Sequence, residues 1–285
     1  MKTIKPIVFI IAFFNFSHVL FSQENSILWK IEGNGLANPS YLFGTIHAIP
    51  KENYFFPDYM KKAFKSTETL IMEIDMNISI SDKLKLASDM LLPDNTTLKN
   101  YTDSATYSFL CNYLKDSLKM SQNKINRIVR IKPIFISSLI IQEKINNIKT
   151  CEDELSKLAK KYRKSIIGLE TVWQQLQIID SVPIHDMIPD SNSLYNIFND
   201  FHKMVDVYNK QDIYHLYEIM QKDSDFISFE DKILITRNHK WIPIIEENIQ
   251  RKSAFIAVGC GHLPGQNGLI EMLRKKGYTV TPVVN

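Results

Sequence analysis

A Gly-x-x-His pattern occurs twice in the sequence, at residues 44–47 and 259–262, each time at the end of an apolar stretch. Histidine can bind a metal ion or transfer a proton near neutral pH. Glycine lets the backbone approach a neighbour closely, and free backbone N–H groups in such turns can stabilise an anion. One such turn is a weak signal. Two at strand ends predict that His47 and His262 meet in one cleft.

Glu73 and Asp75 stand at the end of a third apolar stretch, residues 70–75. A carboxylate among strand residues is costly to bury unless it is paired or bound to a metal. We therefore expect Glu73 to be a metal ligand or a general base. Asp75 would project to the same face and is a secondary candidate. The alternative is that both carboxylates end the strand in solvent.

Glu170 repeats this pattern after residues 166–169, with Gln174 one helical turn further on. It is predicted to support the site, although a carboxylate here could equally complement a helix dipole. Arg237, followed by Asn238, could clamp a carboxylate or pair with Glu73 or Glu170; the alternative is a surface ion pair. Four other histidines lack partners at a useful spacing and are interpreted as ordinary: His185, His202, His215 and His239.

The periodicity of apolar residues predicts the elements that would position these side chains. The first two strands should form a hairpin around a breaker-rich turn, and residues 180–195 should form a loop. The expected strands are 28–32, 41–46, 69–75, 165–169, 254–258 and 278–283. The expected helices are 57–65, 84–92, 107–118, 134–145, 155–162, 171–179, 193–222, 229–250 with a break or kink at Pro243, and 268–276.

These elements predict an α/β fold whose central sheet is formed by strands from both chain ends. The first and last strands must then meet in space. Residues 79–250 would form a large helical insert, interrupted by the strand near 165–169, that acts as a cap. We expect residues 23–285 to form a single domain.

Composition narrows the function classes. Hydrophobic residues make up 45% and charged residues 23% of the chain, which is typical of a globular protein. The net charge of +3 comes without a concentrated basic segment, so no nucleic-acid partner is expected. The sequence lacks GxxxxGK[ST], GxGxxG and GxSxG, which argues against nucleotide hydrolysis, dinucleotide chemistry and a serine hydrolase elbow. Three cysteines argue against a disulfide framework.

The N-terminus has the pattern of a secretory signal. Lys2 and Lys5 precede an apolar run, residues 7–16, and Ser22 offers a small residue for cleavage. We expect residues 1–22 to be removed and the protein to be exported, to the periplasm or outside the cell. The alternative is an uncleaved membrane anchor. Beyond it, the sequence offers no second stretch long enough to cross a bilayer.

At this level of detail the chain resembles the TraB/GumN family, relatives of the Tiki metalloproteases. The resemblance spans nearly the whole mature chain in the right order, with specific ends and a loose helical middle. Its motifs are LFGTIH at 42–47, LIMEID at 70–75, GLET at 168–171 with Gln174, RN at 237–238 followed by Trp241, AVGCGHLPG at 257–265 and GYTVTPV at 277–283.

The resemblance implies an α/β fold with paired GxxH turns, shared with erythromycin-esterase and ChaN-like proteins. For the Tiki branch it implies peptide hydrolysis that depends on a divalent metal ion, manganese or cobalt. Carried over by motif, the core and metal-binding residues are His47, Glu73 and His262, with Glu170, Arg237 and Asn238 in support. Two positions depart from the family. Cys260 stands where members often have a small residue, and residues 151–153 leave open which acidic residue matches the family's aspartate.

Three functions remain. The first is a metal-assisted hydrolase acting on a peptide or protein substrate, with one carboxylate as ligand and another moving the proton. The second keeps the same residues but activates water with a His–Glu pair and no metal. The third is a binding or signalling protein that uses the cleft for a ligand such as haem or a peptide.

Overall fold

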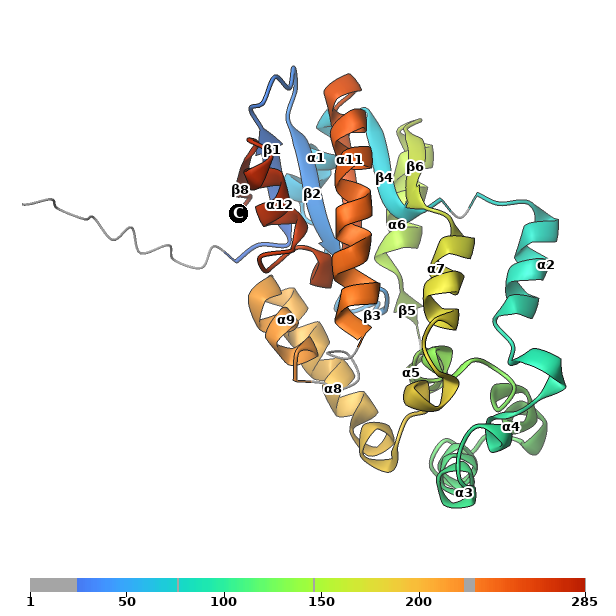
Figure 1. Cartoon of the computed structure of the whole chain (residues 1–285). Helices are drawn as coiled ribbons and strands as arrows, with labels where there is room; N and C mark the ends of the chain where they lie inside the picture. The colour runs from blue at the N-terminus through green and yellow to red at the C-terminus, as the bar shows by residue number, and fades with distance from the viewer. Residues whose placement is uncertain (1–24, 76, 146, 223–228, 285) are drawn as a thin grey trace, which may run out of the picture.

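The computed structural model describes residues 25–75, 77–145, 147–222 and 229–284. Its centre is a six-stranded sheet in the order β6-β4-β7-β2-β1-β8 (Figure 1). The strands are β1 (Leu28–Glu32), β2 (Ser40–Thr45), β4 (Thr69–Ile74), β6 (Ser165–Glu170), β7 (Ala254–Gly259) and β8 (Thr279–Pro282). The α/β prediction with a sheet from both chain ends is therefore confirmed.

The sheet has a parallel core and an antiparallel margin. Strands β6, β4, β7 and β2 pair in parallel. β1 pairs antiparallel with β2 in the predicted hairpin, and with β8, so the first and last strands do meet. Parallel pairing places the carboxyl ends of four strands at one edge. His47, Glu73, Glu170 and His262 all lie at or just after these ends.

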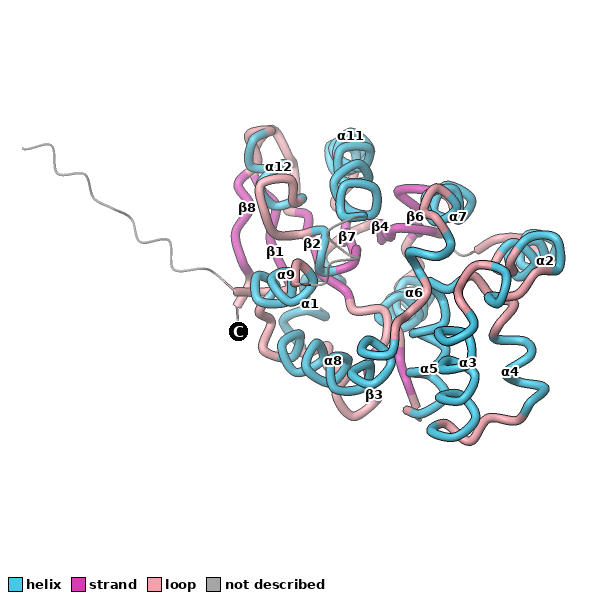
Figure 2. The backbone as a smooth tube through the Cα atoms, turned by 60° about the horizontal axis from the view of Figure 1, so that its bottom comes forward, coloured by secondary structure: helices cyan, strands magenta, loops and turns pink. Residues whose placement is uncertain are grey.

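Helices cover both faces of this sheet. Figure 2 shows α11 (Thr236–Arg251) and α12 (Leu269–Lys275) on one face, with α1 (Asp58–Ser66) and α6 (Cys151–Lys161) on the other. β7 is buried along residues 254–258, as expected for a strand that is covered on both sides and reads as a continuous apolar run.

The helical middle has a hydrophobic core of its own, built mainly from residues 92–140 and closed by Leu194 and Ile197. Beside it, the short strands β3 (Ile49–Pro50) and β5 (Ile148–Lys149) pair outside the main sheet. The remaining helices are α2 (Ile80–Asp89), α3 (Ser104–Asn112), α4 (Gln122–Ile128), α5 (Ile136–Lys144), α7 (Val172–Asp180), α8 (Ser191–Asn209) and α9 (Ile213–Met220).

Some predicted boundaries were wrong. The helix expected over 193–222 is two helices, because the chain turns at Gln211, whose φ is +59°. Residues 180–195 were expected to form a loop. They contain a short 3₁₀ turn (Ile184–Met187), and α8 already begins at Ser191. α4 was not predicted. α11 continues through Pro243 without a break, and its buried apolar face offsets the hydrogen bond that proline cannot donate.

The predicted signal segment, residues 1–22, lies outside the described residues. Within the part of the chain that the structure describes, no helix is long and apolar enough to cross a membrane.

Gly168 lies at a position in the sheet that has no room for a side chain. It pairs with Met72 in the β4–β6 ladder, and a Cβ there would lie 2.7 Å from the backbone N of Asp75 and 3.0 Å from the carbonyl O of Glu170. Gly168→Ala should therefore lower the free energy of unfolding by roughly 1–3 kcal/mol in urea titrations. Ser165→Ala, on the exposed start of the same strand, is the control and should change it by less than about 0.5 kcal/mol. Equal stability of the two variants would contradict this packing.

Candidate active site

The two GxxH turns lie side by side because β2 and β7 are neighbours, with Thr45 opposite Gly259. The two glycines have different neighbours. A Cβ on Gly44 would lie 3.1 Å from Cys260 Cβ, so the first turn packs directly on the second. Gly259 faces the polar groups of the site. Neither glycine has a positive φ, so close approach, rather than special backbone geometry, explains both.

His47 lies at the exposed mouth of the site, with 72% of its side chain accessible. Its Nδ1 is 2.9 Å from Oε1 of Glu152, which also accepts a hydrogen bond from Thr45 Oγ1 at 2.9 Å. The hydrogen bond with Glu152 outweighs desolvation and raises the pKa of His47 to about 9. With Nδ1 engaged by Glu152, Nε2 is the ring nitrogen left for chemistry.

His262 is buried and is held from the opposite side by Asn238. Both N–H groups of the Asn238 amide donate, to the carbonyl oxygens of His262 at 3.2 Å and Asn267 at 2.8 Å. Its Oδ1 therefore faces His262 Nδ1, at 2.7 Å, and can only accept, so Nδ1 carries the proton. Burial, with the charges of Arg237 and His47, lowers the pKa of His262 to about 3. The ring is thus neutral, with a lone pair on Nε2.

Glu73 accepts hydrogen bonds from groups on three different elements, β7, α7 and α11. Its Oε1 accepts a hydrogen bond from the backbone N–H of Gly259 at 2.8 Å, and its Oε2 accepts from Arg237 Nη2 at 2.5 Å and from Gln175 Nε2 at 3.2 Å. Burial alone would raise the pKa of Glu73, but the positive charges of Arg237 and His47 and the backbone N–H of Gly259 lower it overall. The side chain is a carboxylate throughout the physiological range.

Arg237 joins Glu73 to Glu170. Its Nε and Nη2 donate to Glu170 Oε1 at 3.0 and 2.6 Å, and its guanidinium lies 4.6 Å from the centre of the Trp241 ring. Burial lowers the pKa of Arg237, but the two carboxylates raise it overall. The predicted pairing of Arg237 with Glu73 or Glu170 occurs with both at once, and the surface ion pair is excluded because Arg237 is 9% exposed.

The side chains around Gly259 are of the types that bind a divalent ion. A Cβ on Gly259 would lie 3.2 Å from Glu73 Oε1, 3.6 Å from His47 Nε2 and 3.7 Å from His262 Cδ2. One small space is therefore bordered by two imidazoles and a carboxylate, which suit a borderline divalent ion. Even so, among the described residues no group of three His, Cys, Asp or Glu side chains is already arranged to hold an ion.

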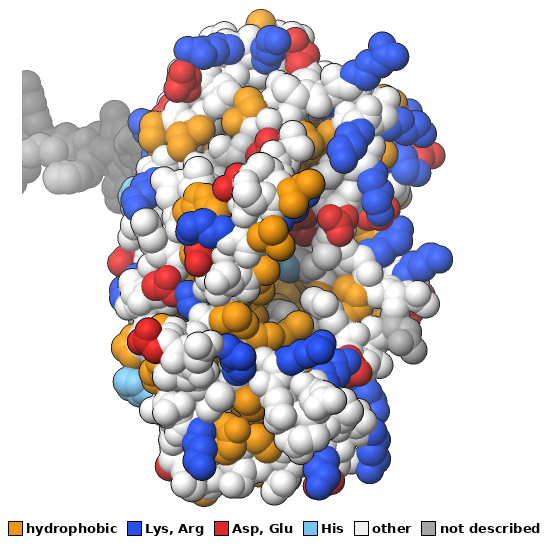
Figure 3. All heavy atoms as spheres, turned by 90° about the vertical axis from the view of Figure 1, so that its right-hand side faces the viewer, with side chains coloured by type: hydrophobic (Ala, Val, Ile, Leu, Met, Phe, Trp, Pro, Cys, Tyr) orange, Lys and Arg blue, Asp and Glu red, His pale blue; other side chains and the backbone are white. Residues whose placement is uncertain are grey.

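A cleft of about 550 Å³ opens beside these groups. Figure 3 shows a hollow in which a histidine lies close to charged side chains, with hydrophobic side chains below and around it. Strand β4 contributes Glu73 between two apolar residues, and helices contribute most of the other polar groups together with an aliphatic wall of isoleucines. The apolar lining residues are Met72, Ile74, Ile134, Ile178, Ile179 and Ile233.

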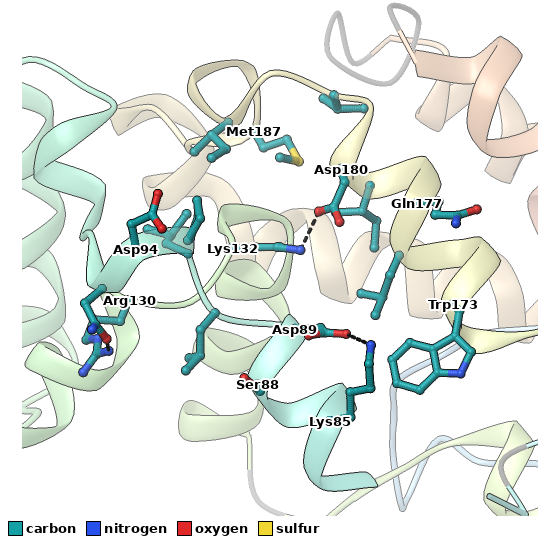
Figure 4. Close-up of a pocket in the computed structure, with 18 residues that line it drawn as sticks. Lys85, Ser88, Asp89, Asp94, Arg130, Lys132, Trp173, Gln177, Asp180 and Met187 are labelled. Carbon is teal, nitrogen blue, oxygen red and sulfur yellow. Dashed lines mark hydrogen bonds and ion pairs between the residues drawn. The ribbon is translucent and has the colours of Figure 1, made fainter. Parts of the chain in front are cut away.

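A second cavity, of about 850 Å³, lies between α2 and α7 and contains none of the predicted site residues. Figure 4 shows that Lys132 faces Asp180 and that Lys85 faces Asp89. Lys132 pairs with Asp180 and Lys85 with Asp89. Because these charges are satisfied internally, we assign no chemistry to this cavity.

Some residues of the site were not predicted from the sequence, and others lie elsewhere than expected. Glu152, which was not predicted as a site residue, is the hydrogen-bond partner of His47. Gln175, not Gln174, reaches Glu73; Gln174 instead forms a capping box with Thr171. Asp75 accepts from the backbone of Asn77 and does not line the cleft.

Cys260 is buried beneath the site, packed against the first turn. Burial raises the pKa of its thiol to about 12. It therefore stays protonated at neutral pH.

Residues 27–282 match the TraB/PrgY/gumN family. The chain belongs to the TraB/PrgY/gumN family. Similar curated members are Metalloprotease TIKI1 of Xenopus tropicalis (24% identical), the Metalloprotease TIKI homolog of Amphimedon queenslandica (23%) and Metalloprotease TIKI1 of Homo sapiens (23%). Each alignment covers 91% of this chain and 62% of the relative, so the chain spans less than two thirds of their length. No solved structure matches it.

In this TraB/PrgY/gumN family member, the effect of Glu152 on the pKa of His47 can be measured. Glu152→Gln should lower the pKa of His47 from about 9 toward its ordinary value of 6.5, followed by NMR titration of the imidazole in chelator-treated protein. Because the folded-state pKa lies above the unfolded value, the pair stabilises the fold fully below the unfolded pKa, and this contribution is lost as the pH rises through about 9.

Glu154→Gln is the matched control, because Glu154 belongs to the same helix but pairs with Lys149 and Lys157. It should leave the titration of His47 unchanged. An unchanged His47 pKa in Glu152→Gln would show that the pair does not form in solution.

Proposed function

We propose that this protein is a hydrolase of peptide bonds whose reaction centre is the space bordered by His47, Glu73 and His262. The observation that carries the proposal is the small space at Gly259, which Glu73 Oε1, His47 Nε2 and the ring of His262 border, with His262 Nε2 3.9 Å from Glu73 Oε1. The relatives named metalloproteases support a peptide or protein substrate.

We propose further that a divalent ion, manganese or cobalt, binds at Nε2 of His47, Oε1 of Glu73 and Nε2 of His262. Such an ion would supply Lewis-acid polarisation of the scissile carbonyl and a water of lowered pKa. Since His47 is protonated at neutral pH, its Nε2 proton has to leave before Nε2 can act as a ligand.

The remaining residues position these groups. Asn238 keeps the proton of His262 on Nδ1, and Glu152 orients the ring of His47. Arg237 carries a fixed positive charge beside the reaction centre, where it can stabilise the negative charge that develops on a carbonyl oxygen. Glu170 holds Arg237 in place and is the second carboxylate available for proton transfer.

A metal-independent hydrolase is the second candidate, favoured by the His47–Glu152 pair. A protonated imidazole at the mouth of a cleft can donate a proton to a leaving amine. In this alternative, His47 is a general acid and Arg237 supplies the electrostatic stabilisation.

The cleft itself points to the kind of substrate. Its aliphatic wall comes from residues 134, 178–179 and 233, so we propose that the helical insert caps the site and receives an aliphatic side chain next to the scissile bond. We also propose that the chain is exported after removal of residues 1–22 and that residues 23–285 act as one domain.

His47→Ala and His262→Ala should each lower peptide cleavage at least about 100-fold, the usual scale for loss of an acid–base or ligand group. Cleavage is measured by mass spectrometry on a mixed peptide library. His239→Ala is the matched control, because this exposed histidine follows Asn238 on α11 but lies outside the cleft. Full activity in both site variants would contradict the proposal that this site is catalytic.

The same assay after exhaustive chelation separates the two candidates. Loss of cleavage that returns with Mn²⁺ or Co²⁺ supports the ion, and bound metal should be lower in His262→Ala than in wild type. Cleavage that survives chelation supports the metal-independent reaction.

Ile178→Ala tests the aliphatic wall. It should lower kcat/KM up to about tenfold for peptides with leucine or isoleucine at the cleavage site, while peptides with alanine there should change little. Steady-state kinetics on paired peptides provide the measurement. A uniform loss for all peptides would contradict a side-chain subsite.

A further inference from the structure

The guanidinium of Arg237 uses every hydrogen-bond donor that it has. An arginine carries five N–H groups in a planar fork. Here Nε–H and one Nη2–H go to Glu170, and the other Nη2–H goes to Glu73. One Nη1–H goes to the carbonyl of Ile233 at 2.8 Å, and the last points at His262 Nε2, 3.2 Å away. The side chain is thus completely engaged within the site.

The contact with His262 has a strict chemical consequence. Because Asn238 fixes the proton on Nδ1, the ring has a single lone pair, and it lies on Nε2. A lone pair that accepts an N–H from Arg237 is not available to a metal ion at the same time. Glu73 is affected as well, since its Oε2 neutralises the guanidinium 2.5 Å away.

We infer that Arg237 is a built-in cation that competes with a divalent ion for Glu73 and His262, so that ion binding requires the guanidinium to withdraw from both. This inference rests on the ion site proposed above. It also accounts for the absence of a ready-made three-residue ion site among the described side chains.

Only part of the Arg237 network has to break. The bonds to Glu170 use Nε and Nη2 of Arg237, whereas His262 Nε2 is contacted by Nη1. Arg237 can therefore stay paired with Glu170 while an ion takes over the charge of Glu73. Glu170 is in this view a positioning residue: it keeps the displaced guanidinium charge-paired, without which a buried charge would be left alone at high cost.

Replacement of Arg237 should consequently tighten ion binding. In Arg237→Gln the lone pair of His262 is free and Glu73 has lost its cation. Isothermal titration of chelator-treated protein with Mn²⁺ should give a Kd at least about tenfold lower than for wild type. The gain should disappear in the double variant Arg237→Gln with His262→Ala, which separates the site from adventitious binding elsewhere.

Glu170→Gln provides an independent, nearly isosteric test in the opposite direction. Mn²⁺ should bind at least about threefold more weakly, because the displaced guanidinium loses its charged partner. In an Arg237→Gln background the same substitution should have a much smaller effect, as a double-mutant cycle would reveal. Circular dichroism shows whether each variant is folded, and if Arg237→Gln is not, Glu170→Gln alone decides.

The outcomes separate this inference from the proposed function. Equal or weaker Mn²⁺ binding in Arg237→Gln, or an unchanged affinity in Glu170→Gln, overturns the competition while leaving the ion site in place. If neither wild type nor Arg237→Gln binds Mn²⁺ or Co²⁺, the ion site and the competition both fall, and peptide cleavage in chelator decides whether the hydrolase proposal stands.

Discussion

The burial of two carboxylates at the ends of neighbouring parallel strands is the constraint on which the site depends. Glu73 and Glu170 lie one strand apart, 13% and 7% exposed in their side chains, and like charges at such a distance need a cation between them. Arg237 supplies it from α11. Removing one partner of such a buried network costs about 3–5 kcal/mol, so the helix and the two strands are tied to each other by the same atoms that define the chemistry.

The two histidines of the repeated motif are chemically different although their motifs are alike. Each is oriented through Nδ1 by a side chain from a helix, Glu152 for His47 and Asn238 for His262. A carboxylate partner raises the pKa of the exposed ring, whereas an amide partner and burial leave the inner ring neutral. A protonated imidazole and a neutral one therefore border the same small space as Glu73 Oε1.

Much of this site could be predicted from local sequence, and the reasons are physical. Glu73, Glu170 and the GxxH turns each end an apolar stretch, and parallel strands bring such ends to one edge. The partner of His47 could not be chosen from residues 151–153, because it depends on how α6 packs against β2 and β4. Gln174 and Gln175 differ only in the face of α7 that they occupy, and the capping box takes the first of them. Chain reversal at Gln211 depends on one residue in a left-handed conformation that many residue types adopt rarely.

Gly259 has a wider meaning for proteins built on this plan. A methyl group there would lie 3.2 Å from Glu73 Oε1 and 3.6 Å from His47 Nε2. A homologous chain could keep both histidines, both glutamates and the arginine and still have this space filled by an alanine. A comparison of the polar residues alone would not detect that change, so the glycine belongs with them as a determinant of the site.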